Sequence, residues 1–227
     1  MVQAAERRWR FKGPEMEGVV ARWYAGIRNS GKQVTEYRKQ AARLTAGLPD
    51  GARILEVAPG PGYLAIEMAR LGHFRVTGLD ISRTFVEIAT EKSAEAGVTA
   101  DFRRGDVATM PFESGIFDLV VCQAAFKNFT QPGNALAEIY RVLRTGGTAV
   151  IDDMSNDASH SDIEAEVKKM ELGAISSFMT KGTLEMLRRR AYSPATFESL
   201  VAKSPFQTCV IRMEGIGLEV RLEKHEV

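Results

Sequence analysis

The stretch ILEVAPGPGYLAIEMAR (residues 54–70) decides the fold of this chain. It opens with a short apolar run that has the length and composition of a buried strand. The residues that close it, continuing to Gly72, have the pattern of a helix that stops at a glycine. The turn between them, APGPG, contains two prolines, and each proline removes a backbone N–H donor. A strand, a glycine-rich turn and a helix in this order predict the first unit of an alternating α/β fold.

The alternation of strands and helices continues along the chain. Strand patterns occur at residues 53–57, 74–80, 100–106, 117–123 and 147–154. Helical patterns lie between them at residues 63–72, 82–97 and 134–143. Ser82 is suited to cap the second helix and Gly97 to end it. This order predicts a doubly wound, mostly parallel sheet with helices on both faces.

The two ends of the chain depart from this alternation. Residues 16–48 have a helical pattern with a break at residues 26–31, which predicts an N-terminal helical cap over residues 1–50. The main domain then covers residues 51–227. Within it, a polar loop and a broken helical run predict a lid-like helical insertion at about residues 155–192. A helix at residues 195–203 follows, with Pro194 at its first turn, and then two strands, 207–215 and 217–224, that we expect to pair antiparallel.

Composition narrows the class of protein. Apolar residues make up 44% and charged residues 26% of the 227 residues, as in ordinary globular domains. The net charge of +1 provides no overall field for nucleic acid or an anionic membrane. Cys122 lies in an apolar run and is interpreted as a buried, reduced thiol, and we find no cluster of metal ligands. Without an apolar run that could span a membrane or act as a signal peptide, we expect a cytoplasmic protein.

The spacing of glycine and acidic residues around the turn indicates a nucleoside ligand. Gly60, Gly62 and Ala65 fit the GxGxxG/A pattern, and Asp80 stands where that pattern places an acidic residue. Asp80 is then at the end of the second strand, where a carboxylate accepts hydrogen bonds from ribose hydroxyls. Two ligands fit this pattern: a nicotinamide dinucleotide and S-adenosylmethionine.

The prolines of the turn and the nearby acidic residues distinguish these two ligands. A dinucleotide contains a pyrophosphate, which binds backbone N–H donors at a helix N-terminus, and Pro59 and Pro61 supply none. S-adenosylmethionine has no phosphate and carries a sulfonium cation, to which Glu56, Asp80 and Asp106 would be acidic neighbours. The residues therefore favour S-adenosylmethionine. A nicotinamide-dependent oxidoreductase is disfavoured further because the chain has no Tyr-x-x-x-Lys pair.

The chain resembles the class I S-adenosylmethionine-dependent methyltransferases of the Rossmann-like, small-molecule type. The resemblance is carried by ILEVAPGPGYLA (54–65), VTGLDIS (76–82), FRRGDVATMPFESGIFDLVVCQAAFKNFTQP (102–132) and LAEIYRVLRTGGTAVI (136–151). It covers residues 53–153 and continues more weakly to the closing strands. It implies a seven-stranded sheet whose last strand is antiparallel. It also implies transfer of a methyl group from S-adenosylmethionine to a small molecule by in-line displacement, with S-adenosylhomocysteine as product.

The resemblance also implies roles for individual residues. Those that would contact the cofactor are Glu56, Ala58, Gly60 and Gly62 at its methionine end, Asp80 at the ribose hydroxyls, Ile81 and Val107 beside the adenine, Asp106 at the adenine amino group, and Gln123 beneath the transfer site. The chain departs from the family at Ala58-Pro59, where the family more often has glycine and a small residue. Whether Ala58-Pro59 reshapes the methionine end of the site stays open at this point.

The residues on the acceptor side are less defined by pattern. Many relatives have a histidine just after the fourth strand, where this chain has Lys127 followed by Asn128. We take as catalytic candidates Lys127, Asn128, Asp152 and His160, and as residues lining an acceptor pocket Tyr24, Tyr37 and Tyr192. Each has an alternative: solvation for the lysine, loop capping for the aspartate, and packing for the tyrosines. A general base is needed only if the acceptor atom must lose a proton.

The expected protein is thus a methyltransferase that acts on a small molecule, as a monomer or homodimer, without nucleic-acid or membrane partners. The main alternative is a module that binds S-adenosylmethionine without catalysing transfer. No residue excludes that alternative, because methyl transfer requires alignment of the acceptor more than any single side chain. The identity of the acceptor and of the methylated atom stays open.

Overall fold

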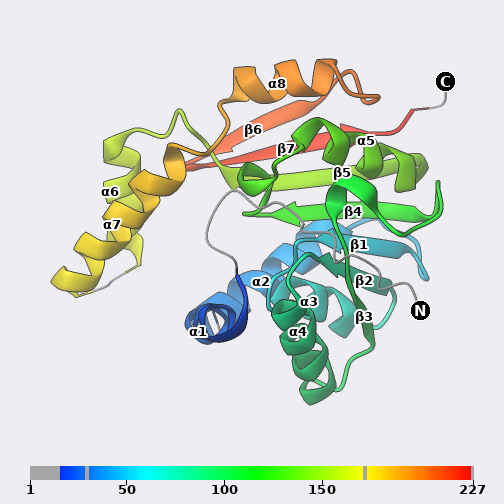
Figure 1. Cartoon of the computed structure of the whole chain (residues 1–227), viewed down its shortest axis with the longest axis horizontal. Helices are drawn as coiled ribbons and strands as arrows, with labels where there is room; N and C mark the ends of the chain where they lie inside the picture. The colour runs from blue at the N-terminus through cyan, green and yellow to red at the C-terminus, as the bar shows by residue number, and fades with distance from the viewer. Residues whose placement is uncertain (1–15, 29–30, 171–172, 226–227) are drawn as a thin grey trace, which may run out of the picture.

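A computed structural model describes residues 16–28, 31–170 and 173–225. Its centre is one seven-stranded sheet in the order β3-β2-β1-β4-β5-β7-β6 (Figure 1). The strands are β1 (Arg53–Val57), β2 (Arg75–Asp80), β3 (Ala100–Arg104), β4 (Phe117–Gln123), β5 (Leu143–Met154), β6 (Val210–Glu214) and β7 (Gly217–Glu223). β1 to β5 pair in parallel, and β7 is antiparallel to both β5 and β6. The predicted α/β class and the antiparallel last strand are confirmed.

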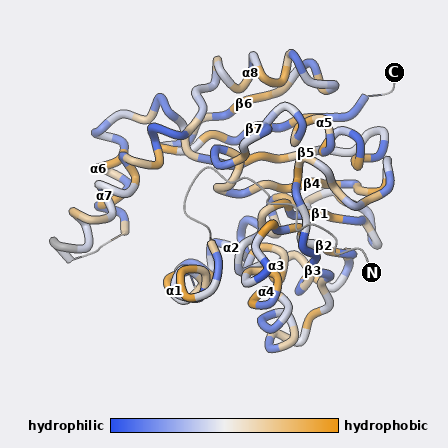
Figure 2. The backbone as a smooth tube through the Cα atoms, in the orientation of Figure 1, coloured by the Kyte–Doolittle hydropathy of each residue, from blue (hydrophilic) through white to orange (hydrophobic). Residues whose placement is uncertain are grey.

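Helices cover both faces of the sheet because the buried strands alternate their apolar side chains between the two faces. On one face, Ile54 and Val121 pack beneath α2 (Gly31–Thr45) and α3 (Tyr63–Arg70). On the other, Leu55 and Val57 pack beneath α5 (Pro132–Val142) and α8 (Pro194–Ala202). Figure 2 shows apolar residues concentrated along the central strands. Glu56 lies between Leu55 and Val57 and therefore faces the α2–α3 side.

Four further helices pack at the margins of the sheet. α4 (Arg83–Glu95) is capped by Ser82, whose side chain accepts from the Phe85 N–H as the sequence predicts. α1 (Gly18–Ile27) packs on α4 through its buried Ala21 and Ala25. Two further helices, α6 (His160–Lys169) and α7 (Ala174–Arg188), pack on each other and project to one side of the sheet (Figure 1). No helix in the described part of the chain is long and apolar enough to cross a membrane.

Several strand boundaries differ from the sequence-based prediction, and those of β3 and β5 have a physical reason in the structure. β3 ends at Arg104 because Asp106 turns back to cap a short 3₁₀ helix (Val107–Thr109) through the Ala108 N–H. β5 begins at Leu143, before the predicted turn at Gly146-Gly147. Gly146 has a φ of 75°, and a Cβ on Gly147 would lie 2.8 Å from the Arg144 carbonyl oxygen. These glycines carry the strand through an irregular register with β4 instead of ending a helix.

Candidate cofactor and acceptor site

The carboxyl ends of four adjacent strands bring the candidate residues into one row. Val57 pairs with Leu79 on β2 and with Cys122 on β4, so the residues that follow them, Ala58, Asp80 and Gln123, lie at the same level. Gln123 pairs in turn with Asp152 on β5. We call Asp80, Ala58, Gln123 and Asp152 the edge row. Ligands of open α/β sheets bind at this carboxyl edge.

The glycine turn that leaves β1 has little capacity to bind phosphate. Gly60 donates its N–H to Asp80 Oδ2 at 2.9 Å, and Gly62 donates to the Pro59 carbonyl at 3.1 Å. Pro59 and Pro61 have no N–H, so the turn directs its two glycine donors inward. Gly62 has a φ of 79°, and a Cβ there would lie 2.7 Å from Ala89 Cβ on α4. This glycine therefore permits close packing of the turn, which supports the preference for a ligand without a pyrophosphate.

Ala58 is the departure from the family pattern noted in the sequence. Its φ is 53°, in the left-handed region that favours glycine, and its N–H donates to the Leu79 carbonyl at 2.8 Å. The alanine therefore keeps the backbone conformation that glycine would adopt, at a cost of about 1 kcal/mol. What alanine adds at this position, compared with glycine, is a methyl group at the edge row.

Glu56 is the one buried side chain in the described residues with an unsatisfied oxygen. It is 2% exposed, and its Oε2 has no hydrogen-bond partner there. Burial raises the pKa of Glu56 to about 8, although the Ala65 N–H at the start of α3 lowers it. An unsatisfied buried carboxyl oxygen is costly. A ligand that brings a positively charged donor group to this strand end would satisfy it.

Asp80, the candidate ribose-binding carboxylate, is held by two backbone N–H groups. It is buried, and it accepts from the Ser82 N–H at 2.8 Å and from the Gly60 N–H at 2.9 Å, one bond to each oxygen. Burial raises its pKa to about 6, and these N–H donors lower it. Each carboxylate oxygen can accept a second hydrogen bond, so two ribose hydroxyls can be held in addition.

The segment before α1 closes over this ribose end, which the sequence did not predict. Glu17 accepts from the backbone N–H groups of Arg83 and Thr84, at 2.9 and 3.0 Å, at the start of α4. Ser82 Oγ donates to the Met16 carbonyl at 2.6 Å. A helix N-terminus is a favourable position for a carboxylate. Glu17 thus attaches the N-terminal segment to the helix that follows Asp80.

The adenine end is built from the turn after β3. Asp106 Oδ1 accepts from the Ala108 N–H at 2.9 Å, which fixes the carboxylate and leaves its second oxygen for an amino group. Val107 is half-buried against the core beside it. Ile81, half-buried after β2, has its carbonyl oxygen bound by Arg104 Nε at 3.2 Å. Ile81, Asp106 and Val107 thus lie near Asp80, where the ends of β2 and β3 are adjacent.

At the other end of the edge row, two amides and a carboxylate form a connected group. Gln123 Nε2 donates to Gln40 Oε1 at 2.6 Å, and Gln40 Nε2 donates to Asp152 Oδ2 at 3.1 Å. Burial raises the pKa of Asp152 to about 6, and Arg43 lowers it. Gln40 and Arg43 both come from α2, and Arg43 forms an ion pair with Glu219 on β7. Asp152 is thus a carboxylate that can take up a proton near neutral pH.

Two of the predicted tyrosines pack around α1 and α2. Tyr37 is 8% exposed and stacks on Tyr63 with ring centroids 5.8 Å apart. Tyr24 meets Phe85 edge-on at 5.9 Å. The guanidinium of Arg28 lies over both Tyr24 and Tyr37, 6.0 and 5.8 Å from their centroids. Burial raises the pKa of Tyr37, so its hydroxyl remains protonated and able to donate.

Comparison with known proteins identifies a methyltransferase domain within the chain. Residues 55–151 match the methyltransferase domain family. A demethylmenaquinone methyltransferase from Deinococcus radiodurans is 33% identical over 123 residues, which are 54% of this chain and 50% of that protein. The chain carries a class I S-adenosylmethionine-dependent methyltransferase domain. It spans about half the length of the curated relatives it matches.

Solved structures agree with the fold of this methyltransferase domain. A putative S-adenosylmethionine-dependent methyltransferase from Methanococcus maripaludis superimposes with a TM-score of 0.68 at 22% identity, over 92% of this chain and 93% of that one. The [4+2]-cyclase SpnF is 28% identical over 55% of this chain and 46% of that one, with a TM-score of 0.51. S-adenosylmethionine is the cofactor of the methyltransferase family. The unsatisfied Glu56 oxygen, the inward-directed turn donors and the paired Asp80 oxygens fit its cationic methionine end and its ribose.

In the methyltransferase domain, Lys127 has a position that its sequence context did not suggest. It is 4% exposed, and its Nζ lies 2.6 Å from Asp153 Oδ1 and 2.5 Å from the Ala124 carbonyl. The Lys127 N–H also donates to Asp153 Oδ2 at 2.9 Å. Asn128 is half-buried in the same short 3₁₀ turn. The ion pair fastens the turn after β4 to the end of β5.

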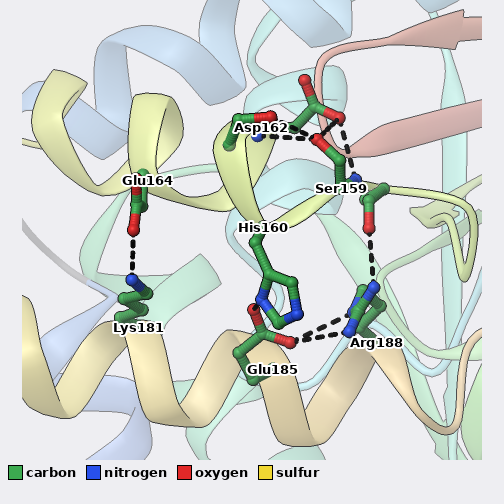
Figure 3. Close-up of polar contacts among 9 residues, drawn as sticks. Ser159, His160, Asp162, Glu164, Lys181, Glu185 and Arg188 are labelled. Atoms are coloured by element: carbon green, nitrogen blue, oxygen red, sulfur yellow. Dashed lines mark hydrogen bonds and ion pairs between the residues drawn. The ribbon is translucent and has the colours of Figure 1, made fainter.

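His160 and Tyr192 lie in different surroundings from the edge row residues. His160, on α6, is exposed and contacts Glu185 on α7, which also binds Arg188 (Figure 3). Figure 3 shows that these groups, with a Lys181–Glu164 pair, connect the two helices of the hairpin. Tyr192 packs edge-on against Phe126 and Phe197, 5.7 and 5.8 Å away, in the core on the α5–α8 face.

Sequence reasoning missed Gln40 and Glu17 as parts of the site. Both come from the N-terminal helical region, where no motif places them. The only sequence signal for Gln40 is its spacing of three residues from Tyr37, which puts the two on one helix face. Nothing in the sequence states which strand end that face meets.

Proposed function

We propose that this chain transfers a methyl group from S-adenosylmethionine to a small molecule, and that the acceptor is a quinol-type phenolic ring. The observation that supports the cofactor most strongly is the buried Glu56 oxygen without a partner, beside a turn whose glycine donors point inward. The acceptor class is suggested by the demethylmenaquinone methyltransferase among the relatives and by Asp152, a carboxylate suited to accept a phenolic proton. We also infer a cytoplasmic location, in keeping with two cysteines that are not paired.

The mechanism assigns binding, orientation and proton uptake to separate residues. When bound, S-adenosylmethionine supplies an electrophilic methyl group on a sulfonium. Asp80 would hold the ribose hydroxyls, and Glu56 would provide negative charge near the methionine end once the bound cation lowers its pKa from about 8. Gln123, in the middle of the edge row, separates these residues from Asp152. We leave Lys127 out of the transfer step because its ammonium group is engaged by Asp153 and the Ala124 carbonyl.

Asp152 takes the acceptor's proton in this mechanism. Loss of a hydroxyl proton makes a phenolic ring nucleophilic at oxygen and at the adjacent ring carbon. With S-adenosylmethionine bound, its methyl group would pass to that oxygen or carbon, and Asp152 would hold the one proton that the acceptor gives up; after attack through carbon, the ring C–H proton would move to the phenolic oxygen to restore the ring. A carboxylate whose pKa is about 6 is ionised and ready to act at neutral pH.

The first test compares ligands and then products. Isothermal titration calorimetry with S-adenosylmethionine and with NAD should show binding of the former only; binding of NAD alone would overturn the proposal. Incubation with methyl-labelled S-adenosylmethionine and 1,4-naphthohydroquinone should then give a labelled organic product. A chain that binds S-adenosylmethionine but labels neither this quinol nor a small-molecule extract would instead use the fold without methyl transfer. The likeness to a cyclase makes that second outcome a real alternative.

A further inference from the structure

The strongest unassigned feature of the site is the amide that links its two halves. Gln40 is on α2, far in sequence from both residues that it contacts, Gln123 and Asp152. Those two residues pair across β4 and β5, so the side chain of Gln40 bridges the ends of neighbouring strands. A surface glutamine that merely covered the sheet edge would not need both of its amide atoms engaged with two edge row residues.

We propose that Gln40 is a positioning residue that sets the proton affinity and orientation of Asp152 at the acceptor side of the transfer site. This inference rests on the proposed function. The amide NH₂ of Gln40 donates to the carboxylate, and a donor stabilises the charged form of a carboxylate. Gln40 therefore keeps Asp152 ionised while it holds the carboxylate at the level of Gln123.

The protonation state of Asp152 determines how the side-chain amides of Gln40 and Gln123 are oriented. An ionised carboxylate only accepts hydrogen bonds, so Gln40 must present Nε2 to Asp152 and Oε1 to Gln123, as observed. Gln123 then donates through its NH₂ group, and its own oxygen is directed elsewhere. Once Asp152 holds a proton, it can donate to Gln40 Oε1, and both amides can reverse. Proton uptake by Asp152 is thereby linked to which atom Gln123 offers at the centre of the edge row.

Other charges around Asp152 do not remove the need for Gln40. Four charged groups act on Asp152: Arg43 from α2, Glu219 from β7, Asp153 from β5 and Glu214 from β6. Arg43 favours the ionised form, and the three acidic groups oppose it. Arg43 is also shared with Glu219, and Asp153 is paired with Lys127. Gln40 is the neutral donor that binds the carboxylate directly.

The test measures the pKa of Asp152 by carboxyl ¹³C NMR in the full chain, without an acceptor. The wild-type value should lie near 6. Gln40→Ala should raise it by roughly 0.4–1 unit, the equivalent of one lost hydrogen bond. Gln40→Glu keeps an oxygen for Gln123 but places a second carboxylate against Asp152, so it should raise the pKa by about 1 unit or more. Lys39→Ala, at an exposed neighbouring position on α2, is the matched control and should leave it unchanged.

Kinetics then connect this pKa to the reaction. With labelled S-adenosylmethionine and 1,4-naphthohydroquinone, the acidic limb of the pH profile of kcat should move by the same amount as the NMR value, while the Kd for S-adenosylmethionine stays the same. A wild-type pKa near 4, a pKa unchanged in both Gln40 variants, or a kinetic limb that does not follow the NMR value would overturn the inference. The NMR titration does not depend on turnover. Failure of the proposed function would appear as absence of S-adenosylmethionine binding in calorimetry. Failure of the inference about Gln40 would instead appear as an Asp152 pKa that does not respond to the Gln40 variants.

Discussion

The two halves of the site satisfy their buried charges in opposite ways. At the ends of β1 and β2, Glu56 has an oxygen without a partner, and Asp80 has acceptor capacity left over. At the ends of β4 and β5, Asp153 is paired with Lys127 and also accepts from the Met154 N–H. One half leaves acceptor capacity that the described residues do not use, whereas in the other half the protein's own residues use it. Buried polar groups that the fold leaves open are therefore better markers of a ligand site than buried polar groups in general.

The largest expected effect is on the free energy of unfolding, in the closed half of the site at the ends of β4 and β5. Lys127→Ala leaves Asp153 buried without its counter-charge, which should lower the free energy of unfolding by about 3–5 kcal/mol. Urea denaturation measures this loss, and the melting temperature should fall by roughly 6–20 °C. Lys39→Ala, which removes an exposed ion pair with Glu36, should change stability by less than about 0.5 kcal/mol. A Lys127 variant as stable as the control would show that the two halves do not differ as described.

The next largest effect is expected on the affinity for S-adenosylmethionine, in the open half of the site at the ends of β1 and β2. Asp80→Asn replaces one of the two carboxylate oxygens by an NH₂ group, which cannot accept a hydrogen bond. Two ribose bonds to a charged group, each worth about 1.5–3 kcal/mol, make the expected loss of S-adenosylmethionine affinity at least about 100-fold by calorimetry. Because the pKa of Asp80 is raised to about 6, wild-type affinity should also fall as the pH drops below that value. Asp101→Asn, at an exposed site on β3, is the control, and equal loss in both variants would contradict the ribose role.

The sequence predicted the open half better than the closed half for a physical reason. The glycines, the prolines and Asp80 lie in one strand–turn–helix–strand unit, so local spacing defines their geometry. Lys127 and Asp153 belong to separate elements, and their burial follows from how the turn after β4 meets β5. The same holds for Gln40 and Glu17, whose contacts depend on where the N-terminal helices dock. The predicted start of β5 was wrong because Gly146-Gly147 is a typical turn signal. Only the sheet register shows that the strand passes through these two glycines.

A pH-dependent effect should follow from Glu56. Its pKa is raised to about 8, so the folded chain retains a proton that the unfolded chain releases above its ordinary value of about 4.5. Glu56 therefore costs no stability below about pH 4.5, and the cost grows as the pH rises toward 8. Glu56→Gln should gain stability over wild type across this window, on the order of 2 kcal/mol by pH 6 and about twice that by pH 8. Thermal melts of both proteins at pH 5, 7 and 8.5 measure this difference in stability.

The same melts with S-adenosylmethionine complete this test. A cationic ligand compensates the ionised Glu56 side chain, so the ligand should raise the melting temperature of wild type more than that of Glu56→Gln at pH 8.5. Asp118→Asn, on the partly exposed start of β4, is a carboxyl-to-amide control outside the edge row. Equal ligand-induced shifts in wild type and Glu56→Gln would assign the unsatisfied oxygen to the fold alone.

The smallest effect compares two alanines that occupy equivalent positions in the two halves. Ala58 follows β1 and Ala124 follows β4, with φ values of 53° and 54°. Their N–H groups donate to the neighbouring strands, at Leu79 and Asp152 respectively. Replacing either by glycine relieves left-handed strain of about 1 kcal/mol but adds freedom to the unfolded chain, so stability should rise by between about 0 and 1 kcal/mol in both variants.

Affinity should separate these two alanines where stability does not. Ala58 is in the turn that receives the methionine end, so Ala58→Gly changes the surface and stiffness of the cofactor half. Ala124→Gly changes a turn that is already fastened by Lys127. We therefore expect a change of roughly 2- to 5-fold in the Kd for S-adenosylmethionine with Ala58→Gly, and none with Ala124→Gly, on the scale of a few tenths of a kcal/mol to about 1 kcal/mol. Equal Kd values for the two variants would mean that alanine in the first turn is a tolerated substitute for glycine and has no part in recognition of the ligand.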